Sequence, residues 1–343
     1  MKGFKVIKSG FFDTIQDLGR SGFQRYGMPV SGAMDSFALR IGNQLLGNKE
    51  NAAGIEISTP SLSLEVLNQT IITITGADFN PTINDSPNPM WKVLKVRKGD
   101  IISFTQIKNG CRSYLLVAGG INVPEVLGSK STYVRGKIGG LEGRPLKKLD
   151  IINIGKQSEG LENITGRKVS NINIPIYQEE NEIKVILGPQ DDYFTKDGLH
   201  TFLSSTYEIT VNSDRMGYRL RGPKIESEKG VDIITDGIPL GSIQITKDGM
   251  PIVMLADRQT TGGYAKIATV ISVDIDKFAQ MKPGNKIKFT GINLEEAHKF
   301  LYEREMNISN MQFEINNKLK SDNVREFKVK LKGKIYEVEI EEI

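Results

Sequence analysis

Short apolar runs recur along the chain and are separated by clusters of Gly, Asp, Asn and Pro, a pattern typical of β-strands joined by turns. The runs are Phe4–Ile7, Gly54–Ile57, Leu62–Val66, Ile71–Thr75, Ile101–Thr105, Tyr114–Ala118, Ile183–Leu187, Tyr207–Val211, Ile252–Leu255, Ile267–Val273 and Ile287–Phe289. Their spacing predicts a mainly β protein built from barrels or sandwiches.

Two segments show helical periodicity instead. From about Ala33 to Leu45, apolar residues recur three and four positions apart, with Ser31 available as an N-terminal cap and Gly47 as a stop. Residues 294–304 repeat this pattern. The sequence therefore predicts a β-rich fold with a few helices.

The length of 343 residues favours two domains, because a single core rarely grows to that size. A turn followed by a strand recurs as KGDIISF at 98–104 and PGNKIKF at 283–289. This echo is compatible with two related β-barrels, and equally with the ordinary reuse of such turns. The polar stretch 156–181 is the predicted linker. We therefore expect a first region over 1–175, a second over 176–310 and a tail over 311–343.

The composition argues against several classes of protein. No apolar run reaches about 18 residues, so no membrane-spanning helix is expected, and the N-terminus is too polar for a signal peptide. A single cysteine, Cys111, rules out an internal disulfide and suits a reducing compartment. The 45 basic and 41 acidic residues are mixed along the chain, which argues against nucleic-acid binding. We expect a cytoplasmic protein with no membrane or nucleic-acid partner.

The histidines narrow the chemistry further. His200 and His298 have no neighbouring Cys or His, so the sequence predicts neither a metal site nor a histidine-based triad. General acid–base catalysis would fall mainly to carboxylates, Lys or Tyr.

Residues 14–35 form the first of four polar clusters. The cluster runs into the predicted helix and contains Gln16, Asp17, Arg20, Arg25, Ser31 and Asp35 among several glycines. A glycine-rich approach to a helix N-terminus can bind an anion through free backbone N–H groups. The alternative is a loop in which Asp17 and Arg20 pair locally and Ser31 only caps the helix. Neither a Walker A motif nor a dinucleotide fingerprint is present.

The second cluster, AGGINVPEVLGSKST at 118–132, offers the hydroxyls of Ser129, Ser131 and Thr132 after a predicted strand. Its glycine pair indicates a close backbone approach or special torsions. A long, tight connection without a site explains the same residues.

The third cluster, NSDRMGYRLRG at 212–222, contains Asp214 and several arginines. In a strand, Arg215, Arg219 and Arg221 would share one face. Arginine suits bidentate recognition of carboxylate or phosphate, but an edge strand with surface ion pairs explains the cluster equally well.

The fourth cluster lies between two predicted core strands, in the stretch ADRQTTGGYAKIATV at 256–270. A hairpin connection needs only two to five turn residues. This one is crowded with polar side chains, and a further amide lies on the preceding strand. The residues concerned are Gln244, Asp257, Arg258, Gln259, Thr260, Thr261, Gly262, Gly263, Tyr264 and Lys266. A turn alone does not explain this density, so we interpret the stretch as a site.

Taken together, four stretches resemble one protein family. They are TIQDLGRSGFQRYGMPVSGAMDSFALRIGNQLLGN, AGGINVPEVLGSKST, VNSDRMGYRLRG and GSIQITKDGMPIVMLADRQTTGGYAKIATV. The family contains the C subunit of 5-oxoprolinase, the regulator KipA, allophanate hydrolase subunit 2 and the carboxyltransferase part of urea carboxylase. The resemblance runs in order from about residue 3 to residue 290.

The resemblance implies two cyclophilin-like β-barrel domains. It also implies a partner chain resembling KipI or the B subunit of 5-oxoprolinase and, for a 5-oxoprolinase, a third chain resembling its A subunit. Such a complex opens the lactam ring of 5-oxoproline to glutamate and uses ATP with Mg²⁺. One alternative is a biotin-dependent carboxyltransferase acting on urea or another small amide. Another is a KipA-type regulator that sequesters its KipI-like partner.

The tail carries a further resemblance. FKVKLKGKIYEVEIEEI, at 327–343, reads as a hairpin about Lys332-Gly333 and is similar to the first hairpin of a biotinyl carrier domain. Such a domain continues for several strands and presents its lysine in an Ala-Met-Lys-Met turn, which this chain lacks. Biotin is therefore expected only on a separate or missing carrier domain.

The expected roles follow from the needs of amide chemistry, namely charge recognition, donors for an oxyanion and a base. We expect Arg215 and Arg258 to hold anionic groups, and Asp257 to orient Arg258 or to act as a base. The remaining fourth-cluster residues would bind substrate through hydrogen bonds or close backbone approach: Gln244, Gln259, Thr260, Thr261, Gly262, Gly263 and Tyr264. Four residues of the first cluster would line the opposite wall or the partner interface: Asp17, Arg20, Ser31 and Asp35.

Overall fold

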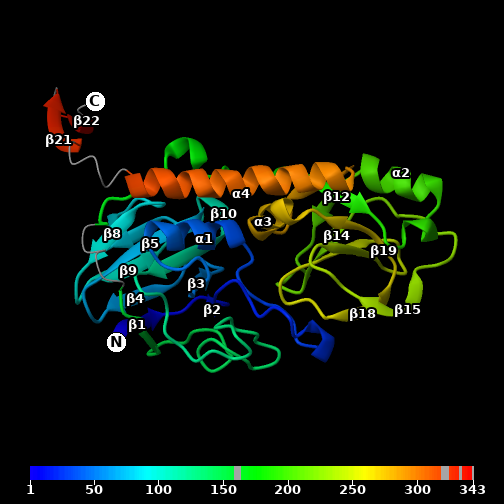
Figure 1. The fold of residues 1–343 in the computed structure, drawn as a ribbon, viewed down its shortest axis with the longest axis horizontal. Coiled ribbons are helices and arrows are strands. Elements are labelled where there is room, and N and C mark those ends of the chain that lie inside the picture. Colours follow the sequence, from blue (N-terminus) through cyan, green and yellow to red (C-terminus); the bar gives the residue numbers. More distant parts are fainter. Residues whose placement is uncertain (158–163, 318–323, 332–333, 342–343) are drawn as a thin grey trace.

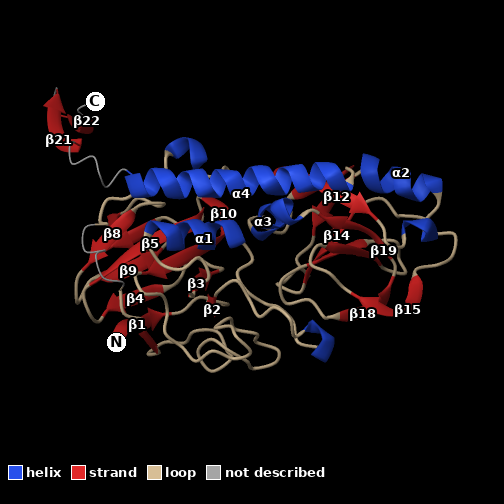
Figure 2. Cartoon of the chain, in the orientation of Figure 1, coloured by secondary structure: helices blue, strands red, loops and turns tan. Residues whose placement is uncertain are grey.

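The computed structural model describes residues 1–157, 164–317, 324–331 and 334–341. The chain is mainly β and folds into two halves, with one long helix, α4 (Leu294–Asn317), running along both (Figure 1). Strands dominate each half, and helices are few (Figure 2). The prediction of a mainly β fold with a few helices is confirmed.

Two antiparallel sheets make up the first half. The six-stranded sheet has the order β11 (Ile151–Asn153), β1 (Lys2–Lys8), β4 (Ser63–Val66), β9 (Ile101–Phe104), β6 (Pro81–Ile83) and β7 (Ser86–Pro87). The five-stranded sheet has the order β2 (Thr14–Gln16), β3 (Gly54–Ile57), β10 (Asn109–Val117), β5 (Thr70–Asp78) and β8 (Val93–Val96). Alternation along the strands sends one set of apolar side chains, including Phe4, Leu64, Ile74 and Leu115, into a core shared by both sheets.

Helices cover the outer face of the five-stranded sheet. α1 (Ser36–Leu45) packs on β5 and β10, and the C-terminal part of α4 packs on α1; Leu39, Ile308 and Met311 of these helices join Leu116 of β10 in one apolar cluster. Arg40 of α1 also forms a two-point ion pair with Glu305 of α4, at 2.7 and 2.6 Å. α4 therefore belongs to the second half by sequence and packs on the first in space.

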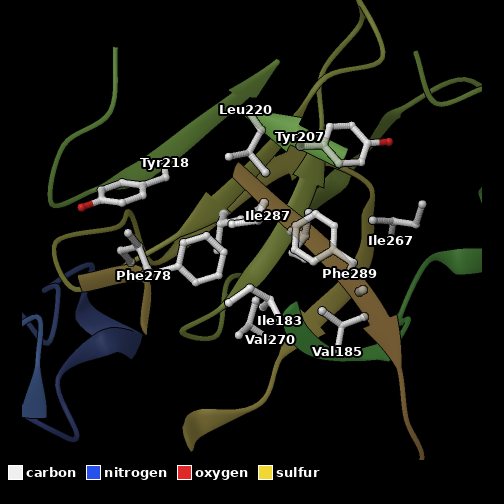
Figure 3. Close-up of a cluster of buried hydrophobic side chains, with 14 of the residues drawn as sticks. Ile183, Val185, Tyr207, Tyr218, Leu220, Ile267, Val270, Phe278, Ile287 and Phe289 are labelled. Carbon is white, nitrogen blue, oxygen red and sulfur yellow. The ribbon is translucent and has the colours of Figure 1, made fainter. Parts of the chain in front are cut away.

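A closed seven-stranded barrel forms the second half. Its strand order is β12 (Glu180–Leu187), β19 (Lys266–Val270), β16 (Ser242–Ile245), β17 (Pro251–Met254), β14 (Gly217–Arg221), β13 (Thr206–Ile209) and β20 (Lys286–Gly291), with β12 and β20 parallel. The interior is filled by aromatic and branched side chains (Figure 3). Phe289 stacks on Phe202 with ring centroids 4.6 Å apart and lies 5.9 Å from Tyr207. Closure leaves the barrel without a free sheet edge.

The connection at 255–265 is not the hairpin that the sequence suggested. β16 lies between β17 and β19 in the barrel, so these two strands are not neighbours. Residues Thr261–Tyr264 form a strand of their own, β18, which pairs with β15 (Asp232–Gly237) outside the barrel. The apolar runs were identified correctly, but their pairing depends on barrel closure, which local periodicity does not encode.

The helix boundaries correct the sequence prediction at two points. α1 begins at Ser36 rather than Ala33, and its cap is Asp35, whose carboxylate accepts from the N–H of Ala38 at 2.8 Å. Ser31 has a positive φ of 55° and is not the cap. α4 extends well beyond the predicted 294–304, because the residues after Arg304 pack on the first half.

The remaining helical elements are short. They are α2 (Lys196–Ser204), α3 (Ile275–Ala279), and the 3₁₀ turns η1 (Gln24–Tyr26), η2 (Asn171–Asn173), η3 (Asp191–Tyr193) and η4 (Ser272–Asp274). η2 lies in the predicted linker, of which residues 158–163 are outside the described chain. The predicted tail hairpin is confirmed as β21 (Val324–Leu331) and β22 (Lys334–Glu341) in antiparallel register; Lys332 and Gly333 lie outside the described residues. Among the helices of the described chain, none combines the length and apolarity needed to cross a bilayer.

Candidate functional site

A buried cluster of four charged side chains lies where the two halves meet. Glu56 comes from β3, Arg112 from β10, Arg215 from the segment before β14, and Asp257 from the segment after β17. Each is at most 7% exposed. Two carboxylates and two guanidiniums balance in charge, which is the condition for burying such groups.

Arg215 links the halves. Its Nε and Nη2 donate to the Asp257 carboxylate at 2.9 and 3.1 Å, and its Nη1 donates to Glu56 Oε1 at 2.5 Å. Nη2 also donates to the carbonyl of Gly32 at 2.6 Å. The fork of the guanidinium thus holds one carboxylate in two-point geometry and a second from the other half.

Glu56 owes its position to strand alternation. Ile55 and Ile57 point into the core of the first half, so the carboxylate between them faces the second half. Glu56 Oε2 accepts from Tyr114 Oη at 2.7 Å and from the Met34 N–H at 2.8 Å. Burial alone would raise the pKa of Glu56, but Arg215 and Arg112 outweigh it and hold the pKa below its usual value, so the carboxylate stays ionised.

Arg112 completes the cluster from the other side. Its Nη1 donates to Tyr218 Oη at 2.7 Å and to the Ala279 carbonyl at 2.5 Å, and its Nε lies 3.8 Å from Glu56 Oε1. Tyr218 lies at one side of the barrel core, beside Phe278 (Figure 3). Burial raises the pKa of Tyr218 to about 12 despite Arg112, so its hydroxyl remains protonated and donates to the Met281 carbonyl at 3.2 Å.

A cavity of about 630 Å³ opens beside this cluster. Glu56, Arg112, Arg215 and Asp257 contribute its charged lining, while Cys111, Ser58, Thr59, Ser213, Asp214 and Arg135 add polar groups, and Phe11, Phe12, Tyr133, Val134, Met216 and Pro283 add apolar ones. The volume lies within the range of small-molecule sites, about 300–1,000 Å³. Both halves contribute, as is common for ligand sites.

A second cavity of about 260 Å³ shares Arg135, Asp214 and Met216 with the first, so the two adjoin. Its other lining residues include Gln244, Gln259 and Tyr264. The structure therefore divides the fourth cluster, with Asp257 on the larger cavity and the two amides and the tyrosine on the smaller.

The other fourth-cluster residues, Arg258 and Lys266 included, line neither of these two cavities. The Thr260 carbonyl accepts from the Ile238 N–H, and Thr261, Gly262 and Gly263 belong to β18. A Cβ on Gly262 would lie 2.6 Å from Ile238 Cδ1 and 2.9 Å from Gln244 Nε2, so this glycine permits a close approach. Substrate binding by these four residues stays a prediction.

The first and second clusters meet each other. The Asp17 carboxylate accepts from Ser129 Oγ at 2.7 Å, Ser131 Oγ at 2.5 Å, and the N–H groups of Gly19 and Lys130 at 2.7 and 2.6 Å. The alternative of a local Asp17–Arg20 pair is wrong, because Arg20 is bonded through Nη2 to the Ser131 carbonyl and has no carboxylate within 4.0 Å among the described residues. Asp17 is therefore saturated by bonds that fix the loop.

Asp35 lies in the junction between the halves. Besides capping α1, its Oδ2 accepts from Gln280 Nε2 at 2.6 Å, and Tyr177 Oη lies 3.4 Å away. Burial, followed by the neighbouring Asp276 carboxylate, raises the pKa of Asp35 to about 7.

The raised pKa of Asp35 predicts a pH-dependent stability. Its ordinary value is 3.8, so between about pH 4 and 7 the folded protein keeps a proton that the unfolded chain has lost. The contribution of Asp35 is therefore full below about pH 4 and is lost as the pH rises through 7. Thermal unfolding over this range should show a steeper fall of Tm in the wild type than in Asp35→Asn. Parallel curves for the two proteins would contradict the assignment.

Several residues of the cavity were missed by sequence analysis. Glu56, Arg112, Phe11, Phe12, Tyr133 and Arg135 were not predicted to contribute. For Glu56 a signal existed, since a carboxylate in the middle of the apolar strand GIEI has to be buried and paired. Arg112 in the strand NGCRSYLLV gives the matching signal, because a cation next to a buried apolar run also has to be paired.

Comparison with known proteins adds to this geometry. The family described as "Carboxyltransferase domain, subdomain A and B" matches residues 26–291, which cover both halves and all four charged residues of the buried cluster. The chain belongs to this carboxyltransferase-domain family. The family resemblance expected from the four motifs is thereby confirmed.

Individual relatives of this carboxyltransferase-domain protein fall into two groups. It is 36% identical to the C subunit of 5-oxoprolinase from Escherichia coli, with 91% of this chain and 99% of the relative covered. It is also 36% identical to the corresponding 5-oxoprolinase protein of Haemophilus influenzae, covering 85% and 92%. The structure of Kluyveromyces lactis urea carboxylase matches with a TM-score of 0.85 and 29% identity, over 91% of this chain but only 29% of that much longer one.

Proposed function

We propose that this chain is the C subunit of a heteromeric, ATP-dependent 5-oxoprolinase. One observation carries the proposal. The match to the Escherichia coli protein extends over 91% of this chain and 99% of the relative, so the similarity covers nearly the whole relative and not only a shared domain. In such a complex, the chain would bind the small lactam or its activated anion and work with partner chains of the A and B types.

The cavity suits the chemistry of an amide. Resonance makes an amide carbonyl a poor electrophile. A site that acts on it must therefore stabilise the charge that develops on the carbonyl oxygen, and it must accept or donate a proton. In our proposal, the Asp257 carboxylate at the cavity accepts the proton, and Arg215 holds Asp257 in position through its two-point contact. Gln244, Gln259 and Tyr264 in the adjoining cavity would orient the substrate through hydrogen bonds.

ATP and Mg²⁺ are assigned to the assembled complex. Within the described residues, no three His, Cys, Asp or Glu side chains converge in a way that could hold a metal ion. The proposal leaves ATP and its Mg²⁺ to the assembled complex and assigns neither of them to a residue of this chain.

We propose further that each half of the fold is one cyclophilin-like domain. The closed barrel of the second half and the paired sheets of the first fit two cyclophilin-like domains, over about 1–175 and 176–310. α4 packs on the first half and also contacts the second, through Arg304 with the Val273 carbonyl and Phe300 with Lys184, so it would act as a brace between the domains. A cytoplasmic location fits the single free cysteine, Cys111.

A second candidate function is a biotin-dependent carboxyltransferase acting on a small amide. The TM-score of 0.85 to urea carboxylase favours it. Carboxyl transfer to nitrogen also needs a base and a charge-stabilising wall, so the same cavity would serve. Biotin would then be delivered by a separate carrier domain.

The assay that decides between the two is ADP release dependent on 5-oxoproline, measured with this chain and its A-like and B-like partners, omitting each chain in turn. The proposal requires turnover that disappears when this chain is omitted and that does not depend on bicarbonate. Turnover dependent on bicarbonate and a biotinylated carrier would favour the carboxyltransferase. Stable association with the B-like chain without any turnover would point to a regulator.

A further inference from the structure

The four buried arginines of the described chain fall into two pairs. Arg112 and Arg215 lie next to carboxylates, as described above. Arg20 and Arg258, exposed by 1% and 5%, have no carboxylate oxygen within 4.0 Å among the residues that the structure describes. Burying a cation without a counter-ion is costly, so each of these two requires an explanation.

Arg20 is explained by its surroundings. Its Nη2 donates to the Ser131 carbonyl, and its Nε and Nη1 are fully buried, where nothing from outside reaches them. The charges of Asp17 and Asp257 are close enough to offset part of the effect of burial on its pKa, which nevertheless stays below the usual value. Arg20 is thus enclosed, and two carboxylates more than 4.0 Å away offset part of the cost of burying its charge.

Arg258 is different. Its Nε donates to the Ile238 carbonyl at 2.9 Å and its Nη1 to the Leu255 carbonyl at 3.2 Å, two neutral acceptors that orient the guanidinium without neutralising it. Burial lowers the pKa of Arg258 to about 10, and no carboxylate of the described residues opposes this shift. The charge is therefore held in place but not balanced.

One end of the Arg258 guanidinium remains open. Nη2 makes no hydrogen bond to the described part of the chain, and it is not among the fully buried atoms without a partner, so the exposed 5% of the residue includes this nitrogen. A planar guanidinium whose outer N–H groups are free suits an oxyanion, which it binds through one or two short, charge-assisted bonds.

We infer that Arg258 is the binding site for an oxyanion supplied from outside the chain, either the carboxylate of the substrate or a phosphoryl group. This assignment rests on the proposed function for the identity of the anion. It separates two residues that the sequence treated alike, because Arg215 is already paired with Glu56 and Asp257, whereas Arg258 has no carboxylate partner among the described residues.

Binding to the full-length chain tests the inference without the partner subunits. Inorganic phosphate and 5-oxoproline are titrated separately by calorimetry at constant ionic strength, against the wild type and Arg258→Met. We expect saturable binding of at least one probe to the wild type, and a loss of at least tenfold in affinity in Arg258→Met. Binding of phosphate alone identifies a phosphoryl group, and binding of 5-oxoproline alone identifies the carboxylate.

Stability distinguishes this role from a structural one. Since Arg258 is buried without a counter-ion among the residues described, Arg258→Met should keep or raise the Tm measured without ligand. Arg221→Gln is the matched control, because it removes a positive charge from an exposed pair with Glu208. Its affinity for both probes should equal that of the wild type.

Three outcomes would overturn the inference: no saturable binding of either probe to the wild type, unchanged affinity in Arg258→Met, or equal losses in Arg258→Met and Arg221→Gln. A failed 5-oxoprolinase assay accompanied by Arg258-dependent phosphate binding would reject the proposed function alone.

Discussion

Replacing Arg215 with alanine should lower the free energy of unfolding by about 3–5 kcal/mol, the cost typical of removing one partner from a buried ion pair. The reason is specific to this cluster. Without Arg215, Asp257 loses the guanidinium that it contacts at two points, and Glu56 loses the nearer of its two cations. Chemical denaturation of the purified chain measures the effect.

The exposed pair Arg221–Glu208 provides the control for Arg215. It has a contact of 2.9 Å, but its side chains are 72% and 38% exposed. Exposed pairs contribute about 0–1 kcal/mol, so Arg221→Ala should change stability by no more than that. If Arg215→Ala were as mild as Arg221→Ala, the buried cluster would not be what holds the two halves together.

Replacing Asp257 with asparagine should reduce kcat of the assembled complex by about 10²–10⁴-fold, the range typical of a lost general base. Asparagine keeps the shape of the side chain and one acceptor oxygen for Arg215, but it cannot take up the proton. Substrate binding should change much less, because the lining of the cavity is otherwise retained. Steady-state ADP release with 5-oxoproline gives both parameters.

Asp232→Asn is the matched control for Asp257. Asp232 is a carboxylate on β15 that pairs with Lys247 at 3.1 Å, and its side chain is 66% exposed, away from both cavities. Its kcat should equal that of the wild type. Undiminished turnover in the Asp257→Asn complex would remove this carboxylate from the reacting site and leave it only a structural role.

The strands could be predicted from the sequence, because the pattern of apolar and turn residues that indicates a strand is local. An apolar run such as Ile71–Thr75 or Ile252–Leu255 is bounded by turn residues wherever it is placed, and both became parts of strands, β5 and β17. The tail hairpin followed from strict alternation in the same way. The pairing of these strands could not be predicted from the sequence, because β16 separates β17 from β19 only once the barrel closes.

Only part of the candidate site could be predicted from the sequence. Asp257 was identified because polar residues crowd the connection after an apolar strand, and Arg215 because it lies in a cluster of arginines. Asp17 and Asp35 attracted attention because they lie in a glycine-rich approach to a helix, yet the structure uses both for hydrogen bonds within the protein. Residue type and density do not tell a loop-fixing carboxylate from a reactive one, because the difference lies in which distant groups meet it.

By itself, the sequence determined the β-rich composition, the family and the neighbourhood of Asp257, since each depends on residues close together along the chain or on motifs kept in order. Tertiary structure alone decided that Glu56 and Arg112 join Arg215 and Asp257, that two adjoining cavities share this junction, and that Arg258 meets no counter-ion in the described part of the chain. These features depend on contacts between residues far apart in the sequence, such as Arg215 with Glu56 at 159 positions and with Gly32 at 183 positions. Burial then converts such contacts into large effects, because a charge removed from water must find its partner wherever the fold places one.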